Sequence, residues 1–185
     1  MKHVVSTALA TLICGAAFAE PIKLTPADPQ PEGLNPGLAV SYTYDAGGRT
    51  LEEAQAKLKR ATPGAPIAGF SYLDSDEGDK TLTSDEAFKV AAAISGYIRF
   101  DAAGTFDVEF LSNDGLLANV GGQQVVLIDG VHGCDTGGVQ QVEVPAAGWY
   151  ALEATYFQRK GSACLLMDWN VSGEMEPVPD DVFGH

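Results

Sequence analysis

A polar corner between two apolar segments is the part of this sequence whose residue types most clearly suit a chemical role. Apolar and acidic residues alternate over 105–111, which indicates a half-buried strand. That strand runs into Ser112-Asn113-Asp114-Gly115, and a second apolar segment follows and stops at a Gly-Gly pair typical of a hairpin turn. Side-chain oxygens held at a strand end suit a metal ion or a sugar hydroxyl. The same residues also suit a plain tight turn, in which the side chains bond only backbone N–H groups.

His132 is a second candidate, because it lies in a loop between Asp129 and Asp135. A histidine there can ligate a metal or act as a base, and it can equally close the loop by a hydrogen bond. The sequence has no H-E-x-x-H, G-x-S-x-G or Cys-x-x-Cys motif. An acidic chain offers carboxylate pairs that a glycosidase could use, but no pair stands out. We therefore predict a protein that is not an enzyme.

The N-terminal residues predict export. Residues 1–19 have a short basic start, an apolar segment and an A-x-A pattern, so we expect a signal peptide cleaved after Ala19 and a periplasmic or secreted protein. Lipidation at Cys14 is the alternative, although Ile13 stands where a small residue is needed. The apolar segment is too short for an ordinary membrane span and no other stretch is long enough, so we expect none.

Charge and cysteine content narrow the functional class further. The formal net charge of −14 argues against binding to nucleic acid or to anionic membranes, which both require basic surfaces. In an oxidising compartment, Cys134 and Cys164 are expected to form a disulfide, and two buried free thiols are the alternative.

Turn residues at short, regular spacing separate many strand-like segments, which predicts an all-β, antiparallel β-sandwich. One short helix is expected over residues 51–60, where Thr50 and Glu53 form a capping box. Residues 20–36 form a proline-rich N-terminal segment, and residues 172–185 form an acidic C-terminal tail that we expect to be mobile. The expected strands are 37–44, 67–73, 94–100, 105–111, 116–120, 124–128, 139–144, 149–157 and 164–171.

Two further features have alternative interpretations. Tyr150 and Trp169, at alternate strand positions, could be a stacking platform for sugars, but such aromatics are more typical of a core. The acidic loop 74–79 begins like a calcium-binding EF-hand loop, but Gly78 stands where a ligand is required, which favours a solvated loop.

Five segments in order resemble the PA-fourteen domain, named for the toxin protective antigen and found also in glycosidases, fungal flocculation adhesins and exported bacterial proteins. The resemblance covers residues 37–171 and implies a jelly-roll-type β-sandwich that often binds carbohydrate. The segments that carry it are 94–100, 104–110, 112–115, 148–157 and 161–169.

The resemblance also implies a site. In the adhesin branch, two consecutive aspartates joined by a cis peptide hold a calcium ion that contacts sugar hydroxyls, and the matching positions here are Asn113 and Asp114. A second loop, here 158–161, adds ligands in that branch. Asn113 replaces an aspartate, although its carbonyl oxygen can still ligate calcium. Gly121 stands where another aspartate is common, and Arg159 and its neighbour bring positive charge to the second loop.

The sequence therefore predicts a non-catalytic module that binds a glycan or cell-envelope polymer, assisted by calcium. The expected ligand-binding residues are Asn113, Asp114, His132 and Gln158, with Asn113 and Asp114 as metal ligands. The alternative is a structural or protein–protein interaction module of a periplasmic or cell-surface assembly, since one fold can host both functions.

Overall fold

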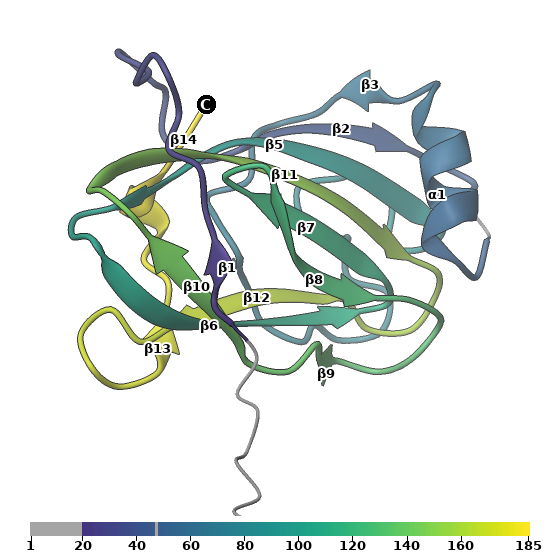
Figure 1. The fold of residues 1–185 in the computed structure, drawn as a ribbon. Helices are drawn as coiled ribbons and strands as arrows, with labels where there is room; N and C mark the ends of the chain where they lie inside the picture. The colour runs from purple at the N-terminus through teal and green to yellow at the C-terminus, as the bar shows by residue number, and fades with distance from the viewer. Residues whose placement is uncertain (1–19, 47) are drawn as a thin grey trace, which may run out of the picture.

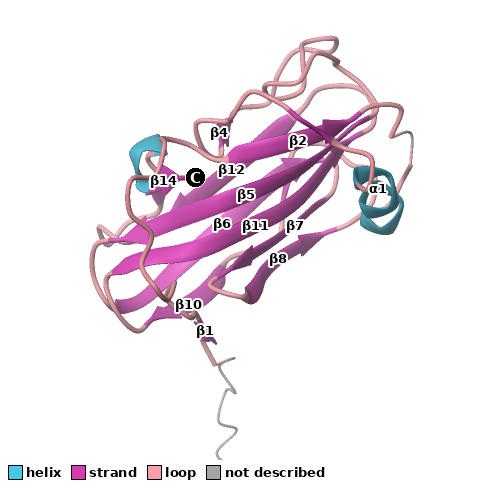
Figure 2. Cartoon of the chain, turned by 90° about the horizontal axis from the view of Figure 1, so that it is seen from above, coloured by secondary structure: helices cyan, strands magenta, loops and turns pink. Residues whose placement is uncertain are grey.

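The computed structural model describes residues 20–46 and 48–185, so the expected signal peptide lies outside the described residues. Two β-sheets pack against each other, and helix α1 (Leu51–Leu58) lies at one end of them (Figures 1 and 2). Apart from the parallel contact of β1 with β10, every strand pairing is antiparallel among the described residues. The prediction of an all-β sandwich with one short helix is confirmed.

Each sheet joins strands that are far apart in the sequence. The first sheet has the order β1 (Ile22–Lys23), β10 (Gln140–Val144), β6 (Gly104–Asn113), β12 (Cys164–Trp169) and β13 (Glu176–Pro177), with β4 (Ser71–Tyr72) on β12 and β9 (Asp135–Thr136) on β6. The second has the order β3 (Thr62–Pro63), β2 (Ala39–Thr43), β5 (Val90–Phe100), β11 (Gly148–Gln158), β7 (Leu116–Val120) and β8 (Gln123–Ile128), with β14 (Phe183–Gly184) on β5.

The core forms between the sheets because apolar residues alternate along the long strands. Phe100 links the two layers: its ring lies 5.4 Å from that of Tyr150, in an edge-to-face contact, and 5.5 Å from that of Trp169. Tyr150 and Trp169 are both buried. They are therefore core residues, and the alternative of an exposed sugar-stacking platform is wrong for this pair.

Helix α1 begins at the expected residue and ends two residues early. The hydroxyl of Thr50 accepts a hydrogen bond from the backbone N–H of Glu53, and the carboxylate of Glu53 accepts one from the N–H of Arg49. These contacts supply acceptors for N–H groups that have no partner inside a helix. Leu51 is buried in a small cluster with Phe157 of β11, which holds the helix against the second sheet.

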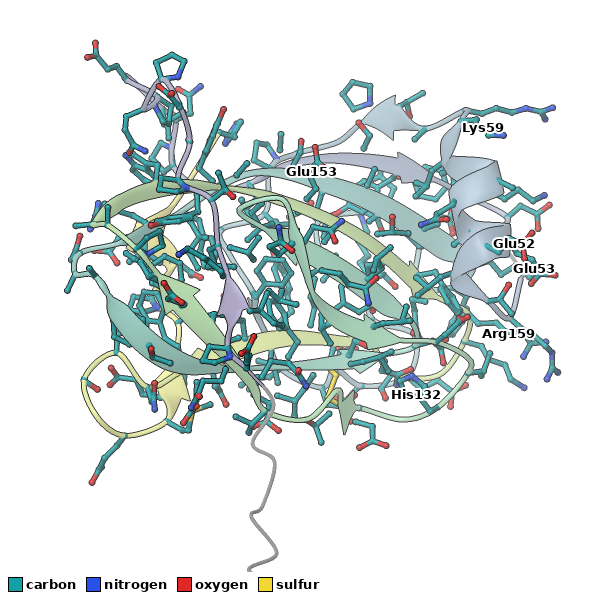
Figure 3. All side chains as sticks on the ribbon, viewed as in Figure 1. Glu52, Glu53, Lys59, His132, Glu153 and Arg159 are labelled. Carbon is teal, nitrogen blue, oxygen red and sulfur yellow. A yellow bond between two sulfur atoms is a disulfide. The ribbon has the colours of Figure 1, made fainter. Side chains whose placement is uncertain are left out.

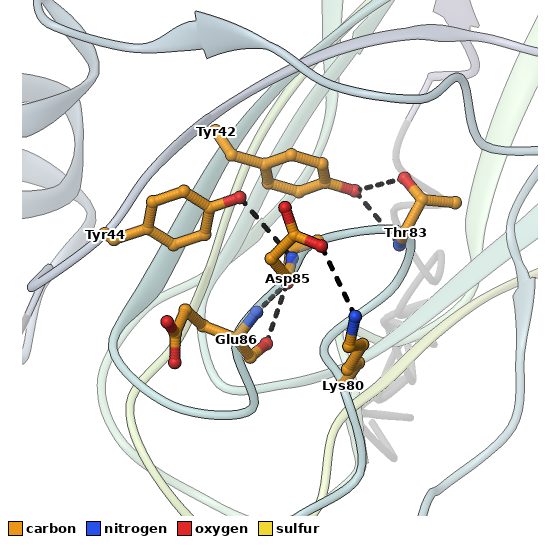
Figure 4. A network of polar contacts seen from close by, with 7 residues as sticks. Tyr42, Tyr44, Lys80, Thr83, Asp85 and Glu86 are labelled. Atoms are coloured by element: carbon orange, nitrogen blue, oxygen red, sulfur yellow. Dashed lines mark hydrogen bonds and ion pairs between the residues drawn. The ribbon is translucent and has the colours of Figure 1, made fainter.

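The loop between β4 and β5 is fastened to β2 by tyrosine hydroxyls (Figure 4). The Tyr42 hydroxyl lies 2.7 Å from the Thr83 hydroxyl and accepts a hydrogen bond from the Thr83 N–H at 3.2 Å. Burial raises the pKa of Tyr42 to about 12, so this phenol stays protonated at neutral pH. A Lys80–Asp85 ion pair of 3.3 Å lies within the same loop.

The N-terminal segment has more structure than we expect from its prolines. Strand β1 pairs with β10, and Leu24, which follows it, is buried. The Gln30 side chain then accepts a hydrogen bond from the N–H of Trp149 at 2.7 Å and donates to its carbonyl at 3.1 Å. These contacts fix the segment along the edge of the sandwich.

The C-terminal residues also differ from the expected mobile tail. Val178, Val182 and Phe183 are buried in the main core, and β14 pairs with β5. Val178 stands between two prolines, and Val182 and Phe183 form only a single apolar pair, so the segment shows no hydrophobic period that would predict a strand or a helix. Among the described residues, no helix is long and apolar enough to cross a bilayer.

Candidate functional site

The polar corner, residues 112–115, lies at the end of β6 and is buried. The peptide bond between Asn113 and Asp114 is cis, and their exposed fractions are 4% and 0%. The corner is bonded to β11: the Tyr156 hydroxyl donates to the Asn113 carbonyl, and the Asp114 N–H donates to the Phe157 carbonyl at 3.1 Å. The strand pairing of the second sheet therefore holds the corner in place from the opposite layer.

The Asp114 carboxylate joins two loops. One oxygen accepts the backbone N–H of His132 at 3.0 Å, and the other accepts the N–H of Arg159 at 2.7 Å. Burial raises the pKa of Asp114, and these two hydrogen bonds partly oppose the rise. A carboxylate has about four lone-pair positions, so each oxygen keeps capacity for a further contact.

Two side-chain amides meet at Ser162 and leave their oxygens free. The Asn113 amide donates to the Ser162 hydroxyl at 3.1 Å, and the Gln158 amide donates to the Ser162 carbonyl. The Asn113 Oδ1 and Gln158 Oε1 atoms are buried without a hydrogen-bond donor. Since a carbonyl only accepts, the contact with Ser162 fixes which end of the Gln158 amide is the oxygen. Buried oxygens of this kind require a partner.

His132 also has an unused atom. Its Nδ1 lies 2.7 Å from the carbonyl oxygen of Gly133, so Nδ1 carries the proton and Nε2 is left as the acceptor in the neutral ring. Nε2 is buried and has no partner. The histidine therefore closes its loop, as one interpretation of the sequence predicts, and still presents a lone pair.

The predicted site residues come together at one end of the sandwich, near α1. Figure 3 shows His132 and Arg159 at that end, and the Arg159 side chain extends outward from it. Four buried side-chain atoms lack a partner among the described residues, and three of them belong to Asn113, His132 and Gln158. Two further residues of the site, Ser162 and Tyr156, were not predicted as site residues, and they lie 49 and 43 residues from Asn113 along the chain.

A disulfide fixes the loop that carries His132. Cys134 is bonded to Cys164 across a separation of 30 residues, which confirms the expected pair. Cys164 stands opposite Asn113 in the pairing of β12 with β6, so the disulfide places the loop over the corner. Asp74 lies close to both sulfurs, but bonded sulfurs are not thiolate ligands, so these three residues are not a metal site.

Three solved structures with the same fold show what this chain resembles. The PA14 domain of the MpAFP antifreeze protein matches with a TM-score of 0.68 at 15% identity, over 85% of this chain and 94% of that chain. The PA14 sugar-binding domain from an RTX adhesin matches with a TM-score of 0.62 at 18% identity, over 81% and 98%. The A domain of epithelial adhesin 9 from Candida glabrata, in complex with Galβ1-3GlcNAc, matches with a TM-score of 0.67 at 14% identity, over 89% and 95%.

Comparisons of the sequence with family models and with curated proteins found no match. At 14–18% identity, the likeness to the solved structures is a likeness of fold. The described part of this chain has the fold of a PA14 domain, as the resemblance in its sequence predicts.

Proposed function

We propose that this protein is an exported, non-catalytic carbohydrate-binding module that uses calcium at the Asn113-Asp114 corner. The observation that carries the proposal is the pair of buried, unpartnered oxygens of Asn113 and Gln158. Both amides bond Ser162, Asn113 directly precedes Asp114, and the residue after Gln158 bonds the Asp114 carboxylate. The loops of His132 and Gln158 would form the rim of the binding surface. The ligand would be a glycan of a cell envelope or an extracellular polymer.

The donor set fits a calcium ion. Calcium prefers oxygen ligands, and the corner offers one carboxylate and two amide oxygens. When bound, the ion would supply a positive charge that attracts sugar hydroxyl oxygens. Asp114 would balance that charge, and Asn113 and Gln158 would complete the coordination. The free Nε2 of His132 would accept a hydrogen bond from a sugar hydroxyl.

The comparisons support the ligand class at the level of fold. The RTX adhesin domain is described as sugar-binding, and the epithelial adhesin domain was solved with a disaccharide. The disulfide supports an oxidising compartment, and hence the export that the N-terminal residues predict.

A glycan array tests the proposal. The wild-type protein with calcium should bind a defined set of glycans, and Asn113→Leu, which removes the free oxygen at similar volume, should abolish that binding. Asn119→Leu, on the outer face of β7, is the matched control and should bind like the wild type. Unchanged binding by Asn113→Leu would contradict the proposal.

A structural or protein–protein module is the second candidate, and one observation favours it. The Asp114 carboxylate already accepts two backbone N–H groups, which is what a purely structural corner requires. An array without any binding, together with a specific partner captured by cross-linking, would favour this function over carbohydrate binding.

A further inference from the structure

Strand β8 is a sheet edge without the features that usually protect one. The strands at the ends of the two sheets are β1, β13, β3 and β8. The first three have two residues each, and each contains a proline or a charged residue. Short length, proline and charge are features that stop a sheet edge from pairing with another chain. Strand β8 has six residues, Gln-Gln-Val-Val-Leu-Ile, and it has none of these features.

The outer edge of β8 has no strand beside it. The strand pairs only with β7, and in the described part of the chain no other backbone–backbone hydrogen bond involves a residue of β8. Figure 2 shows β8 as the last strand on its side of the sheet. A groove of about 800 Å³ lies between Gln123, Gln124 and the N-terminal residues 22–26, so the space beside the start of the strand is open. Unpaired backbone N–H and C=O groups along such an edge are a template for another strand.

Two exposed side chains of β8, Gln124 and Leu127, lie on the outer face of the sheet. Leu127 stands opposite Leu117 of β7, and Gln124 stands opposite Asn119. Leu117 and Asn119 face outward, since they alternate with buried residues along β7. A bulge between these two pairs adds one residue to β8, so positions three apart share the outer face. Leu127 is 56% exposed on this face.

The sequence of β8 is complementary to itself. When two copies of the strand lie antiparallel, with Val125 of one opposite Val126 of the other, each Gln124 stands opposite the Leu127 of the other copy. All four of these side chains then lie on the outer face, so the inward and outward sides of both strands are kept. Residues 124–127 stand opposite the same four residues, so the extra residue of each strand leaves no mismatch.

The distribution of charge permits this contact at β8. The chain has a formal net charge of −14, so two copies repel each other over most of their surfaces. No residue of β8 is charged, and among the described residues Lys23 is the one charged residue that lines the adjoining groove. The first carboxylate after the strand, Asp129, stands opposite Gly122 of the other copy in the same register. The new pairing therefore sets no like charges against each other.

We propose that this protein forms a two-fold symmetric dimer in which the β8 strands of two copies pair antiparallel and join the two second sheets into one. In the described part of each copy β8 is the one long open edge, so association stops at the dimer. Because the strands are antiparallel, the loops that follow them, which carry His132, lie at opposite ends of the new ladder. No residue of β8 belongs to the Asn113-Asp114 corner, so the dimer does not depend on calcium.

Sedimentation equilibrium measures the dimer, at 0.15 M salt, where a Debye length of about 8 Å screens the repulsion between acidic copies. Two double variants at the exposed positions test the register. With Gln124→Lys and Leu127→Lys, like charges stand opposite each other, and the dissociation constant should rise at least about tenfold. With Gln124→Glu and Leu127→Lys, opposite charges face each other and the dimer should be retained. The first variant lowers the net negative charge, so repulsion between whole molecules predicts the reverse order.

A lysine at another exposed leucine is the control. Leu73→Lys, at a 76% exposed position after β4 of the first sheet, should dimerise like the wild type. The proposal is overturned by a wild type that is still monomeric at about 1 mM, the weak end of specific association. Such a monomer would assign the edge to a strand of a different protein. Species larger than a dimer, or equal dissociation constants for the two double variants, would overturn it as well.

Discussion

Asp114 combines stability and the proposed chemistry in one side chain. The sequence was enough to predict that Asp114 lies at a strand end. It was also enough to predict that Asp114 lies close to Asn113, His132 and Gln158. The positions of Tyr156 and Ser162 could not, because their contacts with the corner depend on how β11 and the following loop pack across the sandwich.

Replacement of Asp114 by alanine should destabilise the fold. It leaves the backbone N–H groups of His132 and Arg159 without their acceptor, and a buried donor without a partner costs about 1–3 kcal/mol. We expect the free energy of unfolding in urea to fall by at least about 2 kcal/mol. Asp76→Ala, on an exposed loop, is the control and should change it by less than about 0.5 kcal/mol. Equal stability of the two variants would refute this role.

The raised pKa of Asp114 predicts a pH dependence. The folded protein holds this proton more tightly than the unfolded chain, whose value is near 3.8, so ionisation of Asp114 disfavours folding. Its contribution to the unfolding free energy therefore falls as pH rises from 3.8 through the folded-state pKa, and is constant above it.

The measurement is the difference in unfolding free energy between the wild type and Asp114→Asn, whose side chain does not titrate. The unfolding free energy of the wild type, relative to that of Asp114→Asn, should fall as pH rises from 3.8 through the folded-state pKa of Asp114. Asp168, whose pKa burial also raises, is present in both proteins and cancels. A difference that rises with pH would show that the hydrogen bonds outweigh burial.

Among the elements, long strands and the helix could be predicted because alternation and capping leave a local signal. Short strands such as β1 and β14 leave none, since two residues carry no period. The expected strand at 67–73 shrinks to β4, and Ile67 makes only an isolated bridge with Leu38. Whether these segments form strands depends on tertiary contacts and not on a local sequence pattern.

The C-terminal segment should be a structural part of the sandwich. Phe183 is buried against Phe70, at a ring distance of 5.7 Å, so Phe183→Ala should lower the unfolding free energy by about 3–5 kcal/mol. Met175→Ala, at a 41% exposed position before β13, should leave it within about 0.5 kcal/mol. Urea titration compares the two, and an equally small effect at Phe183 would restore the expectation of a mobile tail.

At the scale of the whole molecule, the Cys134–Cys164 disulfide closes a loop of 30 residues. In the chain-entropy model, such a loop contributes about 3–4 kcal/mol. The double alanine variant should lose about that much unfolding free energy in urea. Thiol counting of the denatured, unreduced wild type should find both of these cysteines oxidised. Two reactive thiols, or an unchanged stability, would contradict this contribution.

The Asn113-Asp114 corner is polar and is bonded to a loop at the α1 end of the sandwich. The resemblance in the sequence could predict this corner, because its motif is contiguous in the chain. The burial of Trp169 against Phe100 could not be predicted with the same certainty, because these two residues meet only after the two sheets pack.

Calorimetric titration of calcium into the protein tests the central claim, that the Asn113-Asp114 corner holds this ion, most directly. With one carboxylate in the donor set, we expect a dissociation constant of roughly 0.1–1 mM for the wild type. Asn113→Asp adds a second carboxylate and should bind more tightly, and Asn113→Leu should give no binding heat. The absence of binding heat from the wild type at about 10 mM calcium, or the same heat from Asn113→Leu, would contradict the calcium site.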